Sequence, residues 1–429
     1  MQKYDAVSRV NMGRWLIWGS FALILLVAPM VFTGGLARTV LSQMGIAIIA
    51  CLSYNILLGQ GGMLSFGHAV YTGLGAFLAI HALNSVSAGS LPIPVSAVPL
   101  AGGLAGAGFA MLLGYVTTRK SGTIFAMITL GMAELVFAMS LMIPEFFGGE
   151  GGVSGNRVAG SATFGITFGP QVQVYYLIAA YTFVCVIAMF AFTRTPLGRI
   201  LNAVRDNPER VEFIGYNPHW VRYLAFIIAG FFAGISGGLG ALSFEIVTAE
   251  VVGAARSGAY LLFTFLGGAT FFFGPIIGGV LMVLATVLLS EFTKAWLLYL
   301  GLIFMFMVMY APGGIASLIM MNVRVAAFGK LSRLWSSYAT LAVAVIVTFA
   351  GLATLIEMIY HLQLNQSIGS TLSFLGVQLD VQNWSSWGSA VVVAAAGVAA
   401  LEISRRRFLL KWGTIQEEIE HEIKRREAP

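Results

Sequence analysis

Apolar runs close to twenty residues long recur along the whole chain, and short polar segments separate them. About 20 mostly apolar residues are needed for a helix to cross roughly 30 Å of hydrocarbon, so each run is a candidate membrane span. Twelve such runs can be delimited: 15–33, 36–58, 66–84, 95–117, 123–143, 173–193, 223–244, 257–273, 275–291, 296–312, 337–360 and 386–403. The pattern predicts an all-α polytopic membrane protein with about twelve transmembrane helices.

Positive charges fall very unevenly on the segments between these runs. If the N-terminus lies in the cytoplasm, alternate segments place 20 of the 24 Lys and Arg residues on the cytoplasmic side. Only four remain outside, and they are Arg38, Arg157, Arg256 and Lys294. Because cytoplasmic loops carry an excess of Lys and Arg, this division predicts that both termini are cytoplasmic.

The composition excludes several classes of function. Of the 429 residues, 58% are hydrophobic and 10% are charged, whereas soluble domains carry about 25% charged residues. So few charges cannot cover a soluble fold of this size, which argues against an ordinary cytosolic enzyme, a nucleic-acid-binding protein and a disordered regulator. The net charge of +6 follows the membrane topology and is not evidence for a nucleic-acid partner.

The sequence shows no pattern of a catalytic, metal or nucleotide site. The five His and three Asp residues are scattered and lack the spacing of metal ligands. Cys51 and Cys185 both lie in apolar runs, which excludes a disulfide scaffold and a four-Cys zinc site. A P-loop string is also missing. We therefore expect no catalytic residues, no metal and no cofactor in this chain.

One carboxylate, Glu134, lies close to the middle of the run 123–143. A charge at this depth costs at least about 2.5–3.5 kcal/mol on insertion scales, so it is expected to face protein or a water-filled cavity. It is then either a pathway or gate residue, or a carboxyl that locks two helices by bonding a neighbouring backbone. The sequence leaves both alternatives open.

The segment from Gly59 to His68 is rich in glycine at the junction of two spans. Its glycines break helical continuity and leave backbone groups free to face a cavity or a partner helix. Gln60, Ser65 and His68 add side-chain donors and acceptors. Because broken helices beside polar groups are typical of transporter substrate paths, we expect these three residues, with Glu134, to line a substrate pathway. A tight cytoplasmic turn with helix-packing glycines is the alternative.

Three glycines, Gly230, Gly234 and Gly238, repeat every four residues within the run 223–244. Small residues at this spacing let helix backbones approach one another closely. We therefore expect this face to serve helix packing and not transport.

The internal segment 194–222 carries a longer motif. It begins RTPLGRILNAVRDNPERVEFIGYNP and runs directly into the glycine-rich helix. This segment closely resembles the cytoplasmic coupling loop of permeases from the high-affinity branched-chain amino acid ABC importers. The residues that match the family's positions are Gly198, Arg199, Ala203, Arg205, Asp206, Gly215 and Asn217.

Further motifs collinear with the same family support the resemblance. They are LLGQGGMLSFGHA (57–69), TLGMAE (129–134), GGEGG (148–152), GPIIGG (274–279) and PGGI (312–315). The resemblance covers about residues 36–316. Pro208 and Val211 depart from it, because the coupling helix usually has Ala there, and the external glycine loop has an additional Gly and lacks Thr. The chain after about residue 320 exceeds the usual family length and lies outside the resemblance.

The resemblance implies the permease subunit of an ATP-driven importer in a bacterial inner membrane. Its expected partners are a second permease in a heterodimer, two ATPase subunits, a periplasmic solute-binding protein and membrane lipids. ATP hydrolysis is then expected on the partners and not on this chain. The loop 194–222 is expected to dock the ATPase through Arg199, Arg205, Asp206, Glu209, Gly215 and Asn217, although a plain solvated loop is the alternative.

Branched-chain amino acids are the substrate class that the resemblance implies, and relatives in the family also carry urea, amides or aromatic acids. No polar cluster in this chain demands an α-amino acid. A second class of function stays open, in which an ion-coupled secondary transporter or channel uses Glu134 for protons or cations.

The chain is expected to consist of three parts. Residues 1–321 form the permease core with about ten helices, and residues 322–404 form a basic linker with two appended transmembrane helices. Residues 405–429 form a charged cytoplasmic tail. We expect the core to carry transport, because only the core is covered by the resemblance.

The tail has a helical pattern in which Ile415, Ile419 and Ile423 recur every four residues among charged side chains. So narrow an apolar stripe buries little area, which predicts a helix that is marginal alone and more stable on a partner. We expect the partner to be an ATPase or the lipid surface. A frayed, solvated tail is the alternative.

Overall fold

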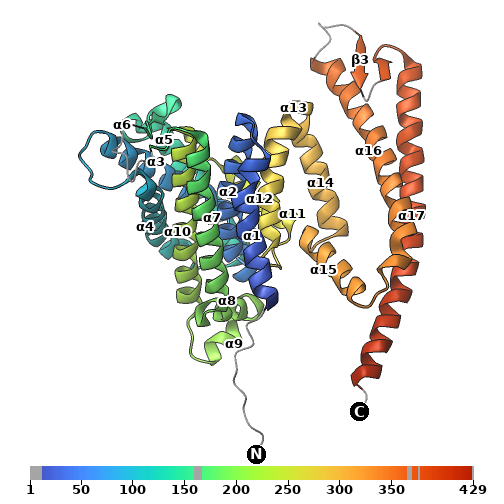
Figure 1. Cartoon of the computed structure of the whole chain (residues 1–429), viewed down its shortest axis with the longest axis horizontal. Coiled ribbons are helices and arrows are strands. Elements are labelled where there is room, and N and C mark those ends of the chain that lie inside the picture. Colours follow the sequence, from blue (N-terminus) through green and yellow to red (C-terminus); the bar gives the residue numbers. More distant parts are fainter. Residues whose placement is uncertain (1–11, 159–166, 365–369, 375–376, 428–429) are drawn as a thin grey trace, which may run out of the picture. The chain divides into compact units, whose positions relative to one another are not determined.

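The computed structural model describes residues 12–158, 167–364, 370–374 and 377–427 (Figure 1). The chain divides into two compact units. The larger, termed the core unit, comprises Met1–Leu289 with Phe304–Ser317, and the smaller, termed the C-terminal unit, comprises Ser290–Ile303 with Leu318–Pro429. Among the described residues, strands are confined to two short antiparallel pairs. The predicted all-α architecture is confirmed.

The core unit is built from long apolar helices joined by short ones. In chain order its elements are α1 (Met12–Val31), α2 (Gly35–Asn55), η1 (Ile56–Gln60), α3 (His68–Ser87), η2 (Val95–Ala97), α4 (Val98–Thr117), α5 (Gly122–Met142), α6 (Pro144–Phe147), η3 (Gly149–Gly151), β1 (Val153–Ser154), α7 (Gln171–Arg194), α8 (Pro196–Asp206), α9 (Pro208–Phe213), α10 (Pro218–Phe244), β2 (Ile246–Val247), η4 (Ala249–Val252), α11 (Ala254–Gly267), α12 (Gly274–Val283) and η5 (Leu284–Leu289). The following α14 (Trp296–Tyr310) and α15 (Gly314–Ala327) contribute residues to both units.

Nine helices in the described part of the chain are long and apolar enough to cross a membrane. The pair α14 and α15, bent by 47°, makes a tenth if it counts as one span. The apolar stretch of α1, Trp15–Val31, is shorter. The chain is therefore a polytopic membrane protein.

The predicted run 257–273 forms a helix only as far as Gly267, where α11 ends after 14 residues. At 1.5 Å per residue, such a helix is about 21 Å long and shorter than the hydrocarbon layer. A turn follows before α12 begins at Gly274. Hydropathy alone therefore does not distinguish a buried half-length helix from a membrane span.

The centre of the core unit is the group α2, α3 and α10, which are the most buried of its long helices. Glycines allow α10 to pack closely on α3 and α4. A Cβ atom built on Gly102 of α4 would lie 2.8 Å from the carbonyl oxygen of Gly234 and 2.9 Å from that of Gly75. No side chain fits between the three backbones, so the predicted packing role of the Gly234 face is confirmed.

One end of the core unit is closed by a clasp between β1 and β2, in which Val153 pairs with Val247 and Ser154 with Ile246. Arg157 extends the clasp. Its backbone N–H donates to Glu245 Oε1 at 2.9 Å, and its guanidinium donates to the carbonyl oxygens of Phe168 at 2.9 Å and Ser243 at 3.0 Å. The charged guanidinium thus satisfies backbone acceptors at the end of α10 and before the start of α7.

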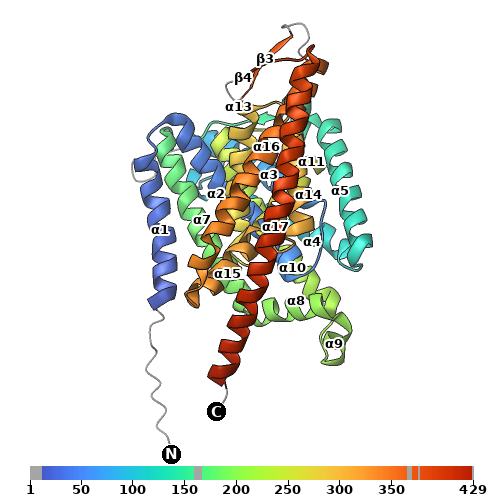
Figure 2. The ribbon, with the colours of Figure 1, turned by 90° about the vertical axis from the view of Figure 1, so that its right-hand side faces the viewer.

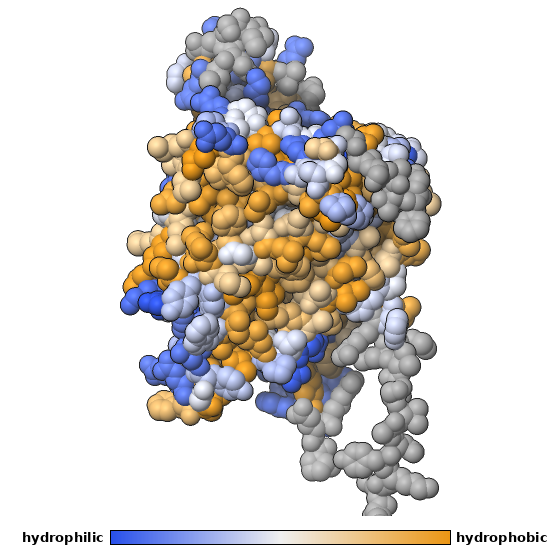
Figure 3. Space-filling view, turned by 90° about the vertical axis from the view of Figure 1, so that its left-hand side faces the viewer, coloured by the Kyte–Doolittle hydropathy of each residue, from blue (hydrophilic) through white to orange (hydrophobic). Residues whose placement is uncertain are grey.

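The other end of the core unit carries α8 and α9, which lie beyond the long helices in both ribbon views (Figures 1 and 2). The surface between the two ends is a broad apolar band, with hydrophilic side chains gathered above and below it (Figure 3). This distribution is the one expected of a protein embedded in a bilayer.

The C-terminal unit is an antiparallel hairpin of α16 (Trp335–Leu364) and α17 (Trp384–Glu427) joined by the strands β3 (Thr371–Phe374) and β4 (Val377–Asp380). It also contains α13 (Ser290–Phe292) and η6 (Leu331–Leu334). The two long helices pack closely where Gly351 faces Ala394 and Gly397 faces Thr348. The last predicted span and the charged tail are one uninterrupted helix, α17.

A carboxylate that the sequence analysis passed over, Glu357, lies within α16. Its Oε1 accepts hydrogen bonds from Thr293 Oγ1 at 2.5 Å and from the Tyr299 hydroxyl at 3.1 Å. These contacts attach the beginning of α14 to α16 inside the C-terminal unit. A single acidic residue in the apolar run 337–360 was the available signal.

The predicted apolar stripe of the tail is present, but its partner belongs to the same chain. Ile415 and Ile419 are 4% and 0% exposed and pack against Val325 and Leu334. The isoleucines need no ATPase or lipid surface to be buried. The expected contact with such a partner through this stripe is therefore wrong, since the linker before α16 already covers it.

Candidate functional site

The junction between α2 and α3 is a break in the helix, and residues 56–67 are termed the glycine break. The chain passes through the π-helical turn η1, leaves helical geometry at Gly61 and re-enters it at His68. A Cβ atom on Gly67 would collide with the backbone carbonyl of Thr129 on α5. Only glycine allows this close approach, which explains why the motif sits at the junction.

Two of the predicted pathway residues, Ser65 and His68, are fully buried and hold the glycine break together. His68 Nε2 lies 2.8 Å from Ser53 Oγ on α2. The Tyr54 hydroxyl donates to the Ser65 carbonyl at 3.0 Å, and the Gly67 N–H lies 3.3 Å from Ser65 Oγ. In this conformation both side chains contact protein and do not line an open channel.

The network contains two buried polar atoms that have no hydrogen-bond partner among the described residues: His68 Nδ1 and Asn55 Oδ1. The His68 ring is enclosed by aromatic rings, with centroids 5.1 Å from Tyr54 and 6.3 Å from Tyr260. Buried polar groups are usually paired, so each exception needs an explanation. Both lie at the margins of the glycine break, where the backbone departs from regular helix.

The third predicted pathway residue, Gln60, meets the predicted coupling loop. Its Oε1 accepts a hydrogen bond from Asn202 Nδ2 on α8 at 3.0 Å. The Arg205 guanidinium, also on α8, donates to the Gly59 carbonyl. Two residue groups that the sequence assigned to separate tasks are therefore in direct contact.

The coupling loop 194–222 contains the starts of three helices, and each start has a side-chain N-cap followed by a proline. Thr195, Asn207 and Asn217 are the N-caps of α8, α9 and α10, and each side chain accepts from a backbone N–H, at 3.2, 3.1 and 2.9 Å respectively. Each cap is followed by a proline at the first helical position, where its missing N–H costs nothing. Pro208, a departure from the family pattern, thus begins α9 and does not disrupt the coupling helix.

The charged residues predicted to contact an ATPase all remain exposed. They are Arg199, Arg205, Asp206 and Glu209. Gly215 is exposed as well, with φ of +90° and open space around its Cα. Asn217 caps α10, so its side chain has a structural task within this chain.

The tip of the coupling loop also exposes large apolar side chains that the sequence analysis missed. Phe213, Ile214 and Tyr216 are 89%, 68% and 48% exposed. On the same loop Leu201 and Val204 are fully buried, so apolar character alone could not tell the two groups apart. A cluster of exposed apolar side chains among charges is typical of a protein interaction site. We refer to Phe213, Ile214 and Tyr216 as the tip patch.

Glu134 lies on the exposed side of α5. The opposite side of this helix is buried at Phe125, Thr129 and Val136. Within the described residues Glu134 makes no hydrogen bond or ion pair, so the backbone partner that is one of the two predicted alternatives is not found there.

A small cavity of about 50 Å³ lies inside the core unit, lined by polar groups of Thr72, Ser236, Arg256 and Tyr260 among apolar neighbours. Its lining residues come from α2, α3, α10, β2, η4 and α11. None of its polar lining residues was among the predicted site residues.

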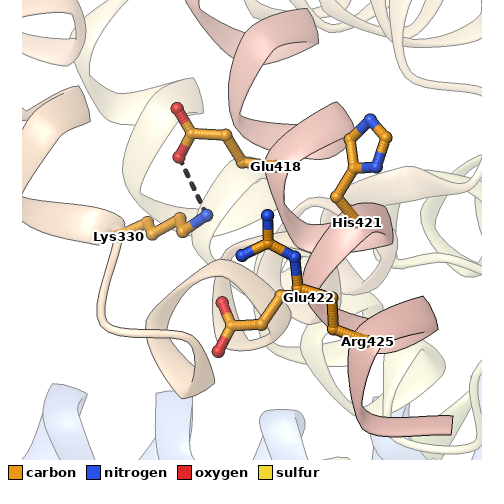
Figure 4. Close-up of a pocket in the computed structure, with 5 residues that line it drawn as sticks. All are labelled: Lys330, Glu418, His421, Glu422 and Arg425. Atoms are coloured by element: carbon orange, nitrogen blue, oxygen red, sulfur yellow. Dashed lines mark hydrogen bonds and ion pairs between the residues drawn. The ribbon is translucent and has the colours of Figure 1, made fainter. Parts of the chain in front are cut away.

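The C-terminal unit has a charged hollow of about 610 Å³ lined by Lys330, Glu418, His421, Glu422 and Arg425 (Figure 4). Lys330 Nζ and Glu418 Oε2 point toward one another at 2.8 Å, and the Arg425 side chain reaches between Lys330 and Glu422. Charges of both signs face one another here, which is typical of a solvated surface of ion pairs. In the described part of the chain, no group of three His, Cys, Asp or Glu residues could hold a metal ion.

Comparison with known proteins identifies the chain's relatives. Residues 36–312 match the family model described as "Branched-chain amino acid transport system / permease component". The chain is 29% identical over 291 residues to the high-affinity branched-chain amino acid transport system permease protein LivM of Salmonella typhimurium, covering 63% of this chain and 67% of that protein. It is 28% identical over 292 residues to the protein of the same name from Escherichia coli, with the same coverage of 63% and 67%. No solved structure matches.

Proposed function

Because the chain belongs to the permease family of the branched-chain amino acid transport systems, we propose that it is the permease subunit of an ATP-driven importer in the inner membrane. The substrates proposed are branched-chain amino acids or related small solutes. The observation that carries the proposal is the coupling loop, which exposes the tip patch among charges at one end of the core unit. ATP hydrolysis is assigned to partner subunits that dock on this loop.

The surface of the coupling loop supports the proposal that an ATPase docks there. Phe213 is 89% exposed, and Ile214 and Tyr216 lie beside it. Aromatic side chains that insert into a pocket of a partner contribute much of the energy of an interface. Arg199, Asp206 and Glu209 are exposed on the same loop and supply a polar rim. We assign the tip patch to the pocket and the charges to the orientation of the ATPase.

A second permease subunit is proposed to cover the exposed side of α5. Glu134 stands there between exposed apolar side chains, among them Met127 and Leu135 at 74% and 57% exposure. Leaving the carboxylate in lipid would cost at least about 2.5–3.5 kcal/mol. A heterodimer contact removes this cost and places Glu134 on a solute path between the two permeases.

The three residues of the glycine break are proposed to serve the inner end of this path. Gln60 lies beside α8, whereas Ser65 and His68 are fully buried. They reach a solute only if the break opens during transport. Both termini are proposed to lie in the cytoplasm, which places α8 and α9 on the ATPase side and leaves the opposite end for a periplasmic solute-binding protein.

Two alternatives remain part of the proposal's test. Urea, amides and aromatic acids are alternative substrates, since no polar cluster predicted from the sequence demands an α-amino acid. An ion-coupled secondary transporter or channel is the alternative class, and the intramembrane position of Glu134 is the observation that favours it.

The composition of the native complex tests the proposal. Affinity purification of the tagged chain from its own membranes in mild detergent is expected to bring down one further polytopic permease and P-loop ATPases in stoichiometric amounts. The binding protein of the system, titrated with branched-chain amino acids, urea, amides and aromatic acids, then identifies the solute. A chain that purifies alone and moves solute in response to an ion gradient would contradict the importer assignment.

Glu134 offers a sharper prediction. Glu134→Gln removes the charge and keeps the shape, and we expect it to change the rate of uptake while the two permeases still co-purify. Glu357→Gln is a suitable control, because that carboxylate accepts two hydroxyl hydrogen bonds that the amide oxygen can still accept. Unchanged uptake in Glu134→Gln would remove this residue from the path.

A further inference from the structure

We propose that the glycine break relays movement of α8 to α5, with Asn202 and Thr129 as the positioning residues at its two ends. The inference rests on the proposed function, because α8 is expected to move only if an ATPase docks on the coupling loop. It adds a route through this chain from the docking surface to the helix that carries Glu134. Neither Asn202 nor Thr129 was among the predicted site residues.

The first contact joins α8 to the beginning of the break. Asn202 Nδ2 donates to Gln60 Oε1 at 3.0 Å, and Arg205 donates to the Gly59 carbonyl. Apolar contact accompanies these bonds, since a Cβ atom on Gly61 would lie only 3.3 Å from Leu201 Cδ1. Leu201 is 0% exposed. A displacement of α8 therefore cannot leave the residues of η1 in place without breaking buried contacts.

The segment between the two contacts can change shape without unfolding a helix. η1 is a π-helical turn, which is often found at functional sites. Residues 63–67 beyond it belong to no helix or strand. Asn55 Oδ1, buried beside Gly59, has no donor among the described residues, so a shifted break that brought an N–H group to it would recover a hydrogen bond. The break thus has a physical reason to adopt a second arrangement.

The second contact joins the end of the break to α5. The Phe66 N–H donates to Thr129 Oγ1 at 3.1 Å, and the Thr129 hydroxyl donates to the Ala126 carbonyl at 2.9 Å. Gly67 lies against the Thr129 backbone so closely that no side chain fits between them. Thr129 is 2% exposed. The end of the break is therefore fixed to α5 by a side chain and by backbone contact.

Helix α5 is well placed to respond. Only 33% of the apolar stretch of α5 is buried within this chain, compared with 83% for the span that begins with α2 and 72% for α3. A helix held on one side can tilt at less cost than one enclosed by neighbours. Glu134 follows Thr129 by five residues, about 7.5 Å along the helix axis. A pull at Thr129 would move the exposed carboxylate at the proposed permease contact.

The test measures coupling in the reconstituted importer as solute molecules taken up per ATP hydrolysed. Asn202→Leu removes the side-chain amide at similar size, and Thr129→Val removes the hydroxyl at the same shape. Each is expected to keep basal ATP hydrolysis, because the tip patch is unchanged, and to lower the coupling ratio about tenfold, the scale of one lost buried hydrogen bond. The double variant is expected to lose no more than the worse single variant, because residues that act in one series are not additive.

Matched variants separate relay from packing. Thr182→Val is the control for Thr129→Val, since Thr182 is fully buried but its hydroxyl bonds only Ile178 within its own helix. Thr129→Ser keeps the hydroxyl and loses the methyl group, so it is expected to keep wild-type coupling. The double exchange Gln60→Asn with Asn202→Gln keeps the summed length of the two side chains. It is expected to recover the coupling that each single exchange lowers.

Each outcome decides between two claims. If the wild-type complex does not hydrolyse ATP to drive uptake, the proposed function fails and the relay fails with it. If the wild type is ATP-driven but Asn202→Leu and Thr129→Val keep its coupling ratio, only the relay is overturned. Multiplicative losses in the double variant, or an equal loss in Thr182→Val and Thr129→Ser, would also overturn the relay in favour of general packing effects.

Discussion

The coupling loop and the C-terminal end of α17 are both charged segments with a few large apolar residues, yet the structure treats these residues in opposite ways. On the coupling loop Phe213 and Ile214 stand 89% and 68% exposed. On α17 Ile415 and Ile419 are 4% and 0% exposed, covered by residues of the same unit. The apolar side chains of the loop are left exposed, whereas those of α17 are covered within the C-terminal unit.

The difference teaches that an apolar stripe among charges does not by itself identify an interface. The stripe of α17 recurs every four residues and suits a partner helix, but that partner is the linker around Val325 and Leu334. The tip of the coupling loop has no helical period and still presents the larger exposed apolar surface. What separates them is whether the chain's own fold covers the side chains.

The largest effect is expected at the tip patch. Phe213→Glu places a charge where a partner pocket is expected. We predict that binding of the ATPase weakens by at least about 2 kcal/mol, as is typical of a central interface residue, and that the ATPase no longer co-purifies. Phe213→Tyr, which keeps the ring, is expected to retain the ATPase. Insertion of the chain in the membrane should be unchanged in both. Retention of the ATPase by Phe213→Glu would make the coupling loop a solvated segment after all.

An intermediate effect is expected at the covered stripe. Ile419→Ala removes buried methyl groups and is predicted to destabilise the cluster by about 2–5 kcal/mol. Limited proteolysis should then cut α17 beyond Arg407 more rapidly, while ATPase co-purification is unaffected. Glu420→Ala changes an exposed neighbour and is the control. Loss of the ATPase in Ile419→Ala, without loss in the control, would show that the two regions do not differ as described.

The smallest effect is expected at the ion pairs that surround the stripe. Glu418 accepts from Lys330 at 2.8 Å and from Arg333 at 3.1 Å, and the Glu418 and Arg333 side chains are 47% and 64% exposed, whereas that of Lys330 is 16% exposed. Exposed pairs contribute little and are screened by salt. Glu418→Gln should therefore raise proteolysis only slightly, and the difference should shrink as salt is added. A change as large as that of Ile419→Ala would mean that charge and not burial holds α17 in place.

Much of the fold follows from patterns that act over short distances. Hydropathy places most of the long helices, and the four-residue spacing of Gly230, Gly234 and Gly238 predicts the close packing of α10. The start of α9 at Asn207 and Pro208 is a local signal of the same kind, although the sequence analysis treated Pro208 only as a departure from the family pattern. These features depend on neighbours in sequence or on one helix face, so the sequence contains their cause.

Contacts between distant segments could not be read in the same way. Asn202 and Gln60 are 142 residues apart, and nothing in either segment shows that the two amides meet. The exposure of Glu134 also depends on how α5 packs. An acidic residue in an apolar run gives the same sequence pattern whether it faces the interior of its own chain or the surface. Glu357 is a second acidic residue within an apolar run, so the sequence contained a signal for it that the prediction did not use.

ATP-driven uptake is the measurement that tests the importer assignment most directly. Proteoliposomes that contain the native complex and its binding protein would be given labelled solute, with ATP supplied on the side of Phe213 and with ionophores to collapse ion gradients. We predict uptake that requires ATP, persists with ionophores and disappears in Phe213→Glu. Uptake that persists without ATP, stops with ionophores and is indifferent to Phe213→Glu would contradict the assignment and favour an ion-coupled transporter.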